Sequence, residues 1–336
     1  MKPKIRFIDL FAGIGGFRIA ADEFFRNHRI KAKCVFSCEI DSHCRTAYSS
    51  NFGDNPFPDI TKKDPKDIPE HEILFAGFPC QPFSIIGNGK GFDDARGTLF
   101  FEIAKILKEQ KPKAFILENV KRFVNHNNGQ TLKRILETLR GLDYEVDYKV
   151  LNALDFGLPQ KRERVFIVGF YKPRSPVLFT WPQKHYLFTP LSDILETNVH
   201  PKHFASEKIL LKRKTMHKSK YKPAIWHENK AGNISSYPFS CALRAGASYN
   251  YLLVNGERRL TPREMLRLQG FPDSFKTVVP DSQVRKQAGN SVPVNVVKAV
   301  LESVWHKLKN ELDLIKKNSS KETHGRRKNT AIENRF

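Results

Sequence analysis

The chain has 336 residues, 40% of them hydrophobic, so it is too long and too apolar for a disordered tail or for a mini-protein that depends on disulfide bonds. Its 57 Lys and Arg residues outnumber its 35 Asp and Glu residues, which gives a net charge of +22. A surface with this charge attracts polyanions, and we expect a nucleic acid ahead of an anionic membrane face or of no polyanionic partner.

Short β-branched or aromatic runs alternate with segments of helical period over the first 170 residues. This pattern is typical of a parallel sheet with helices packed on its faces. We expect one helix around Ile103–Leu107 and another over Leu132–Leu139 that ends near Gly141. Strands are predicted at Ile5–Phe11, Lys33–Glu39, Ile73–Gly77, Ala114–Glu118, Tyr144–Leu151 and Arg164–Phe170. The predicted fold class is therefore α/β, with a doubly wound, mostly parallel sheet and a smaller irregular domain.

A glycine-rich turn follows the first predicted strand and opens a helix. The turn contains, in order, Phe11, Gly13, Gly15 and Gly16. Its backbone can approach a ligand closely, at a helix N-terminus with free N–H groups. Glu39 ends the second predicted strand, where an acidic residue reaches a ribose diol in doubly wound folds. The spacing is not GxGxxG and the loop is shorter, which favours S-adenosylmethionine over NAD; a tight turn without a ligand is the remaining alternative.

Cys80 follows the third predicted strand, at the edge of the sheet where α/β proteins build their sites. It stands between Pro79 and Pro82, in a long segment, residues 78–98, with little predicted secondary structure. Such a segment in a compact domain is usually functional, often as a lid. A lone cysteine is more often a buried packing residue, but this setting favours an exposed nucleophile.

Glu118 ends the fourth predicted strand, so its carboxyl emerges at the same edge as Cys80. In a partly dry site its pKa would rise, and the carboxyl could hold a proton for a ring nitrogen. Arg162 and Arg164 enter the last predicted strand on one side, where they could orient an acid and a phosphate. Taken singly, these residues could equally be a solvated acid and a charged strand entrance.

The second half of the chain is less regular. It begins with Pro173, Pro176, Pro182 and Pro190, and periodicity stays weak to about residue 255. Residues 201–230, the basic segment, contain nine Lys and Arg against two Glu, with Tyr221 and Trp226 in and beside the charged run. We expect this segment to contact phosphates, with a solvated basic loop as the alternative.

Regular structure is predicted again towards the C-terminus. The capping box Thr261-Pro262-Arg263-Glu264 starts a helix that ends before Pro272. After Ser291, valines and leucines at helical spacing predict a last helix that packs back on the sheet. Residues after about 318 are predicted to form a disordered basic tail.

Five motifs, in sequence order, resemble those of the DNA cytosine-C5 methyltransferase family. They are Phe7–Phe17, Pro79-Cys80-Gln81, Glu118-Asn119-Val120, Gln160–Arg164 and Gln287–Ser291. The resemblance covers roughly residues 5–170 and 255–305, and the small size is similar to that of the bacterial restriction-modification enzymes. Residues 186–255 correspond to the family's variable target-recognition region, where the basic segment also lies.

The resemblance implies an S-adenosylmethionine-dependent methyltransferase fold and methylation of C5 of cytosine in a specific duplex DNA sequence. The Cys80 thiolate would add to C6 of a flipped-out base, while Glu118 would give N3 a hydrogen bond or proton. Arg164 would lie near the base and the acid, and Arg162 completes the implied catalytic set. C5 would then take the methyl group, which leaves S-adenosyl-L-homocysteine, and loss of the C5 proton would expel Cys80.

The resemblance also implies which residues bind the cofactor. Glu39 would bind the ribose, Ile40 would pack on the adenine, and Asp59 would meet the adenine amino group. Asn290 would contact the methionine end. The other residues implied to line the cofactor are Phe11, Gly13, Gly15, Gly16, Pro79 and Leu99. One departure from the family is Ile86, where some relatives carry a small polar residue.

The motifs predict a division into domains. Residues 1–185 and 286–318 form the catalytic and cofactor-binding domain, residues 186–285 the target-recognition domain, and residues 319–336 the tail. We expect a monomer that binds double-stranded DNA, with no metal and no membrane contact. A cognate restriction endonuclease, where one exists, would act on the same site without a stable complex.

The five cysteines are odd in number and irregularly spaced, unlike a secreted disulfide framework or, for Cys34, Cys38 and Cys44, a zinc site. The N-terminal stretch does not resemble a signal peptide, because Asp9 and nearby glycines interrupt its apolar run. No apolar run approaches the roughly 18 residues of a membrane span. The expected location is the cytoplasm, at the nucleoid. Two rival functions remain: a tRNA C5-methyltransferase, since an RNA-acting branch resembles the same motifs, and a DNA-binding regulator without activity.

Overall fold

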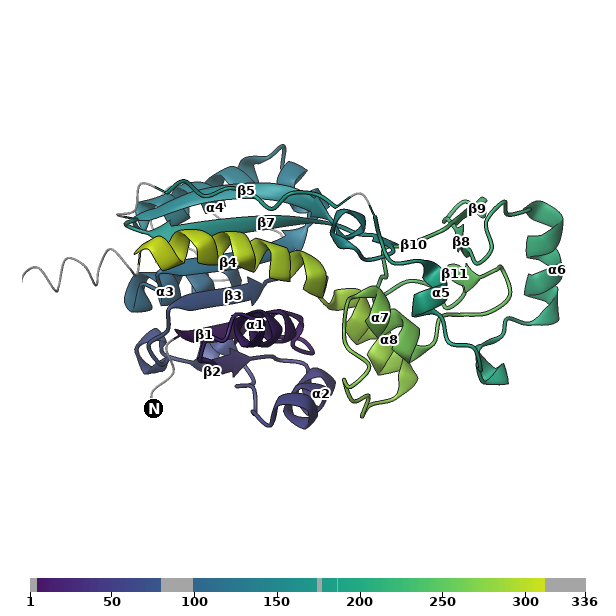
Figure 1. The fold of residues 1–336 in the computed structure, drawn as a ribbon, viewed down its shortest axis with the longest axis horizontal. Helices are drawn as coiled ribbons and strands as arrows, with labels where there is room; N and C mark the ends of the chain where they lie inside the picture. The colour runs from purple at the N-terminus through teal and green to yellow at the C-terminus, as the bar shows by residue number, and fades with distance from the viewer. Residues whose placement is uncertain (1–4, 80–98, 174–176, 186, 312–336) are drawn as a thin grey trace, which may run out of the picture.

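A six-stranded sheet organises the larger lobe of the protein in the computed structural model, which describes residues 5–79, 99–173, 177–185 and 187–311 (Figure 1). The strands are β1 (Ile5–Leu10), β2 (Ala32–Cys38), β3 (Ile73–Gly77), β4 (Ala114–Val120), β5 (Tyr144–Asn152) and β7 (Glu163–Tyr171). Their order is β2-β1-β3-β4-β7-β5, and β7 alone runs antiparallel to the other five strands. The six predicted strands and the mostly parallel sheet are confirmed.

Helices cover both faces of this sheet, because alternate side chains of each strand enter two separate apolar cores. The helices are α1 (Gly16–Asn27), α2 (Ser42–Phe52), α3 (Leu99–Gln110), α4 (Gln130–Gly141) and a last helix over residues 294–311. Phe7 and Phe75 share a core with α1 and the last helix, whereas Leu10 and Leu74 share the other core with α3 and α4. The doubly wound arrangement and the return of the last helix to the sheet are therefore confirmed (Figure 1).

A smaller lobe projects from one end of the larger one (Figure 1). It contains β8 (Ile225–Glu228), β9 (Ile234–Tyr237), β11 (Leu252–Val254), α5 (Leu191–Ile194), α6 (Glu207–Met216), α7 (Pro262–Leu268) and α8 (Asp281–Asn290). The three strands form an antiparallel sheet in the order β11-β8-β9. A short parallel pair, β6 (Gln160–Lys161) with β10 (Ser240–Cys241), connects the lobes. The capping box of α7 is confirmed, since Thr261 N donates to Glu264 Oε2 at 2.8 Å and Glu264 N donates to Thr261 Oγ1 at 3.2 Å.

The basic segment differs from its prediction as an irregular stretch, because it contains helix α6 and strand β8. α6 lacks the apolar stripe by which a helix is recognised in sequence, and its Leu211 is 60% exposed. Trp226 is 6% exposed and packs edge-on against the His217 ring, 4.7 Å between centroids. Trp226 therefore belongs to the core of the smaller lobe and is not a surface aromatic for a nucleic acid.

The charge of the basic segment is also smaller than its sequence suggests, because four of its basic side chains pair with acids. The ion pairs are Lys202 with Asp281, Lys212 and Arg213 with Glu228, and Lys214 with Glu257. Asp281 and Glu257 lie outside residues 201–230, so a count over that window misses them. Within the described part of the chain, the basic residues of this segment without an ion pair are Lys208, Lys218, Lys220, Lys222 and Lys230.

Some sequence predictions concern residues that the structure does not describe. Cys80, Ile86 and most of segment 78–98 lie outside the described residues, as does the predicted tail, 319–336. Across the ranges that are described, no helix combines the length and the apolar character needed to cross a bilayer.

Candidate active site

A cavity of about 510 Å³ lies at the carboxyl ends of β1 to β4, where the two lobes meet. The larger lobe contributes the glycine turn, the ends of these strands and the start of β7, and the smaller lobe contributes Leu243, Arg244 and the end of α8. Eleven of the fourteen predicted site residues line it, namely Phe11, Gly13, Gly16, Glu39, Ile40, Pro79, Leu99, Glu118, Arg162, Arg164 and Asn290. The structure thus gathers into one space residues that are up to 279 positions apart in sequence.

The glycine turn is held in place by the carboxylate of Glu39. Gly13 N donates to Glu39 Oε2 at 2.8 Å, and Asp41 N donates to Glu39 Oε1 at 2.8 Å. Gly13 has a φ of +56°, and no atom lies within 4 Å of the position that a Cβ would take. The turn therefore leaves open space beside its backbone, at the point where α1 begins.

Gly15 and Asp59 are the two predicted site residues within the described chain that do not line the cavity. Gly15 has a φ of +86°, and a Cβ there would overlap the ring of Phe52, so glycine is required for the turn and its packing. Asp59 accepts hydrogen bonds from Thr61 N at 3.0 Å and Thr61 Oγ1 at 2.8 Å, and these bonds lower the pKa of its carboxyl. Asp59 caps a short turn in this structure, and its contact with the adenine amino group stays a prediction.

Glu118 and Arg164 form an ion pair in the cavity, with Arg164 Nε 2.9 Å from Glu118 Oε1. The antiparallel pairing of β4 with β7 brings them together. Val120 lies opposite Arg164, and Glu118, two residues before Val120, points to the same face of the sheet. Burial raises the pKa of the Glu118 carboxyl, and the guanidinium groups of Arg164 and Arg162 oppose this rise. The expected combination of a desolvated acid and a nearby arginine is present.

Arg162 makes contacts that its position in the sequence does not indicate. Its side chain is 1% exposed and donates to three backbone carbonyls rather than to an acid or a phosphate. The acceptors are Leu243 O at 3.0 Å, Gly289 O at 3.0 Å and Ser291 O at 2.6 Å. Arg162 therefore joins the larger lobe to two segments of the chain that line the cavity. Its Nε has no hydrogen-bond partner among the described residues, and its expected part in orienting an acid or a phosphate stays a prediction.

Comparisons with known proteins agree with this architecture. The sequence model of C-5 cytosine-specific DNA methylases matches residues 5–306. The chain is 56% identical to the Type II methyltransferase M.NgoBI of Neisseria gonorrhoeae, over 87% of this chain and 90% of that protein. It is 54% identical to the Type II methyltransferase M.HaeII of Haemophilus aegyptius, over 90% of this chain and 93% of that protein.

The chain belongs to the C-5 cytosine-specific DNA methylase family. It is thus a DNA cytosine-5 methyltransferase of the bacterial type that the motifs predict. Solved structures share the fold of this methylase: Entamoeba histolytica methyltransferase EhMeth has a TM-score of 0.70 at 20% identity, over 91% of this chain and 99% of that one. S. pombe Dnmt2 methyltransferase has a TM-score of 0.67 at 20% identity, over 91% of this chain and 100% of that one.

Several residues that line the cavity of this methylase were not predicted from sequence. Leu243 and Arg244 come from the variable region, where no motif marks them. Asp41 caps α2 by accepting a hydrogen bond from His43 N. Its position just after a predicted strand could have marked it as a cavity residue. Cys44 also lines the cavity, and burial raises the pKa of its thiol to about 12.

Proposed function

We propose that this methylase transfers a methyl group from S-adenosylmethionine to C5 of a cytosine flipped out of a specific duplex DNA sequence. The observation that carries the proposal is that one cavity contains both the pair of Glu118 and Arg164 and the turn held by Glu39. Glu118, which suits a cytosine base, and Glu39, which suits the nucleoside of the cofactor, thus line the same cavity. Direct transfer of a methyl group from cofactor to base requires both ligands to lie in one space.

The part of the cavity around Gly13 fits the cofactor. The open space beside the Gly13 backbone admits a ligand, and each Glu39 oxygen accepts one N–H while keeping a lone pair for a ribose hydroxyl. Ile40 is 73% exposed and offers apolar surface to an adenine ring. Asn290 also lines the cavity and would contact the methionine end. When bound, S-adenosylmethionine supplies the methyl group of its sulfonium.

The part of the cavity around Glu118 would take the cytosine. The Cys80 thiolate forms the bond from Sγ to C6 with its own electron pair, and Glu118 donates a proton to N3 as negative charge enters the ring. After C5 has been methylated, loss of the C5 proton to solvent restores the C5–C6 double bond and expels the thiolate, and N3 returns its proton to the Glu118 carboxylate. Cys80 lies outside the described residues, but Pro79, which precedes it, lines the cavity. Arg164 keeps the Glu118 carboxyl oriented throughout.

We further infer a monomer in which residues 1–185 and 286–318 carry catalysis and residues 186–285 carry sequence recognition, with residues 319–336 as a basic tail. The names of M.NgoBI and M.HaeII, both Type II methyltransferases, support a role in protecting host DNA from a cognate restriction endonuclease. The enzyme would act on double-stranded DNA at the nucleoid, in the cytoplasm.

A covalent adduct tests the proposed mechanism. The protein is mixed with S-adenosylmethionine and a random-sequence duplex in which 5-fluorocytosine replaces cytosine, because fluorine cannot leave C5 as the proton does. The parent protein should give a mass increase equal to the bound DNA, and Cys80→Ala should give none. Absence of the adduct in the parent, or an undiminished adduct in Cys80→Ala, would refute the mechanism.

Transfer of tritium from labelled cofactor decides between the rival functions. We expect label in duplex DNA and none in tRNA; the reverse result would favour the RNA-acting alternative. Calorimetry that finds no cofactor binding would favour a regulator without activity. Bisulfite sequencing of DNA from a host that expresses the protein would then identify the recognised sequence and the modified cytosine.

A further inference from the structure

Arg244 lies where the catalytic cavity opens onto the surface of the smaller lobe. It lines the cavity together with Glu118 and Arg164. It also lines a second, open hollow of about 860 Å³, here called the outer cleft, which lies between residues 228–232 and residues 244–251. Arg244 is therefore placed at the rim between the site of chemistry and the recognition lobe.

The positive charge of Arg244 is not neutralised within the described part of the chain. No carboxylate described there forms an ion pair with its guanidinium. The acidic residue that lines the outer cleft, Glu228, already pairs with Arg213 at 2.7 Å and with Lys212 at 3.3 Å. Lys230 adds a further positive charge to the cleft lining. The rim thus attracts an anion from outside the protein.

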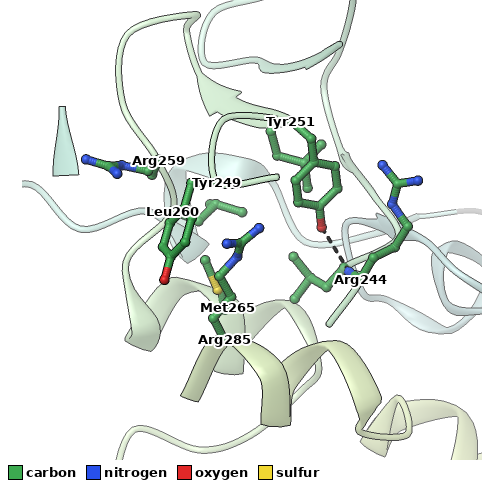
Figure 2. A pocket seen from close by; sticks show the side chains of 9 residues that line it. Arg244, Tyr249, Tyr251, Arg259, Leu260, Met265 and Arg285 are labelled. Atoms are coloured by element: carbon green, nitrogen blue, oxygen red, sulfur yellow. Dashed lines mark hydrogen bonds between the residues drawn. The ribbon is translucent and has the colours of Figure 1, made fainter. Parts of the chain in front are cut away.

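The loop that carries Arg244 is held rigidly. The Arg244 guanidinium carbon lies 4.7 Å from the centre of the Tyr251 ring, and Arg244 N donates to Tyr251 Oη at 2.9 Å (Figure 2). From α8, Arg285 donates to the carbonyls of Ala247 and Ser248, both at 2.7 Å. An arginine that is stacked and fixed before binding loses less conformational entropy when a ligand arrives.

The backbone on both sides of Arg244 is also held, by Arg162 of the larger lobe and by Gly289 of α8. The preceding residue, Leu243, accepts a hydrogen bond from the buried Arg162 at 3.0 Å. The following residue, Ala245, lies so close to Gly289 that a Cβ at position 289 would overlap its backbone nitrogen. These contacts set the position of Arg244 relative to Glu118 through the protein interior.

We propose that Arg244 binds a phosphate group of the target strand, next to the cytosine that is methylated. This inference rests on the proposed function, because it takes the cavity to hold the flipped base. With the base inside the cavity, the part of that nucleotide that stays at the rim is its sugar and phosphate. A guanidinium binds phosphate oxygens with two parallel N–H donors, and stacking on Tyr251 leaves its edge free to do so.

The salt dependence of DNA binding tests the proposal. Fluorescence anisotropy would measure duplex affinity, with S-adenosylhomocysteine present, for the parent, Arg244→Ala, Arg244→Lys and the control Arg134→Ala, which removes an exposed arginine from α4. Arg244→Ala should weaken binding about tenfold and lower the slope of log affinity against log salt by about 1. Arg244→Lys should keep the slope. Arg134→Ala should change neither quantity, and all variants should bind S-adenosylhomocysteine like the parent.

Methylphosphonate substitution then locates the contact. On the site found by bisulfite sequencing, each phosphate around the target cytosine is replaced in turn by a neutral methylphosphonate. One substitution beside the target cytosine should weaken binding by the parent and by Arg244→Lys, but not by Arg244→Ala. An unchanged slope in Arg244→Ala, a changed preference between sites, or a loss at every position would overturn the proposal. A parent that does not methylate DNA would instead overturn the proposed function.

Discussion

Glu118 and Arg164 lie on neighbouring antiparallel strands, and their side chains, 10% and 14% exposed, meet at 2.9 Å. Two opposing effects act on the same carboxyl: burial favours its neutral form, and the guanidinium favours its charged form. The net effect is a raised pKa, so the carboxyl keeps a proton at a higher pH than an exposed glutamate does. This property makes Glu118 suited to giving a proton and taking it back.

Glu118→Gln should lower methyl transfer about 100-fold or more, because an amide cannot donate a full proton to the base. The affinity for S-adenosylhomocysteine should stay unchanged. Tritium incorporation into DNA gives the rate and calorimetry gives the affinity. Retention of most of the parental rate would show that the proton comes from another group.

Arg164→Met should shift the pH dependence of the reaction. Activity of the parent should decline as pH rises through the raised pKa of Glu118, since the proton is then lost. Removal of the guanidinium removes the group that opposes the raised pKa, so the declining limb should move to higher pH. A rate profile measured at saturating DNA and cofactor checks the direction; movement to lower pH would contradict the assignment.

Glu39→Gln should weaken cofactor binding about tenfold, because a side-chain amide offers one acceptor where two backbone N–H groups need acceptors. Gly13 or Asp41 would lose its bond, and the glycine turn would loosen. Calorimetry with S-adenosylhomocysteine measures the effect. Glu23→Gln, which alters a carboxylate that pairs with Lys298 on the surface, serves as the matched control and should bind like the parent.

Gly289→Ala should lower the free energy of unfolding by about 1–3 kcal/mol, because the new Cβ would overlap the backbone of Ala245 and push α8 away from the loop that carries Arg244. Chemical denaturation gives the value. The control is Gly141→Ala at the end of α4, where a Cβ meets no atom within 4 Å. Gly141→Ala should leave stability unchanged or raise it slightly; equal losses in the two variants would argue against the close approach.

Asp9→Asn should make stability less dependent on pH. Asp9 is fully buried in β1, and neither carboxylate oxygen accepts a hydrogen bond from the described residues. Burial raises its pKa well above the ordinary value of 3.8, so the folded state binds a proton more tightly than the unfolded state does. Stability from this group is complete below that ordinary value and is lost as pH rises towards the raised pKa.

Melting temperatures at pH 5 and pH 8 check this sign. The advantage of Asp9→Asn over the parent should be larger at pH 8 than at pH 5. Parallel changes in the two proteins would mean that Asp9 does not titrate differently in the folded and unfolded states.

Changing Lys218, Lys220 and Lys222 together to Gln should flatten the salt dependence of DNA binding, because these exposed lysines have no ion pair within the described chain. Cofactor affinity should not change. The matched control replaces Lys202, Lys212 and Lys214, which already pair with acids, and should have a smaller effect. An equal effect in both triple variants would contradict the distinction between paired and unpaired charge.

The strands and most of the cavity residues could be predicted from sequence because they depend on local patterns. An apolar run predicts β3. The glycines after β1 predict the turn, and Glu39 at the end of β2 is the acid that binds the turn in the structure. Glu118 was predictable because strand order brings the carboxyl ends of parallel strands to one edge.

Long-range partners were not predictable in the same way. The ion pair of Lys202 with Asp281 and the bond from Arg162 to Leu243 join residues about 80 positions apart, and no local pattern marks either one. Helix α6 was missed because charged residues on all its sides remove the periodic signal. Gly15 was correctly predicted to be part of the turn. That its Cα faces Phe52 and does not line the cavity depends on packing, which the sequence does not indicate.

Helix α8 limits how this enzyme can acquire a new DNA specificity. Its Arg285 holds the loop that carries Arg244, while its Gln287 and Asn290 line the cavity. A recombination event that exchanged residues 186–285 with a relative would join two parental sequences inside this helix. Chimaeras should stay active when the junction falls before Asp281, or when the donor supplies an arginine at position 285 to a recipient that keeps Gly289.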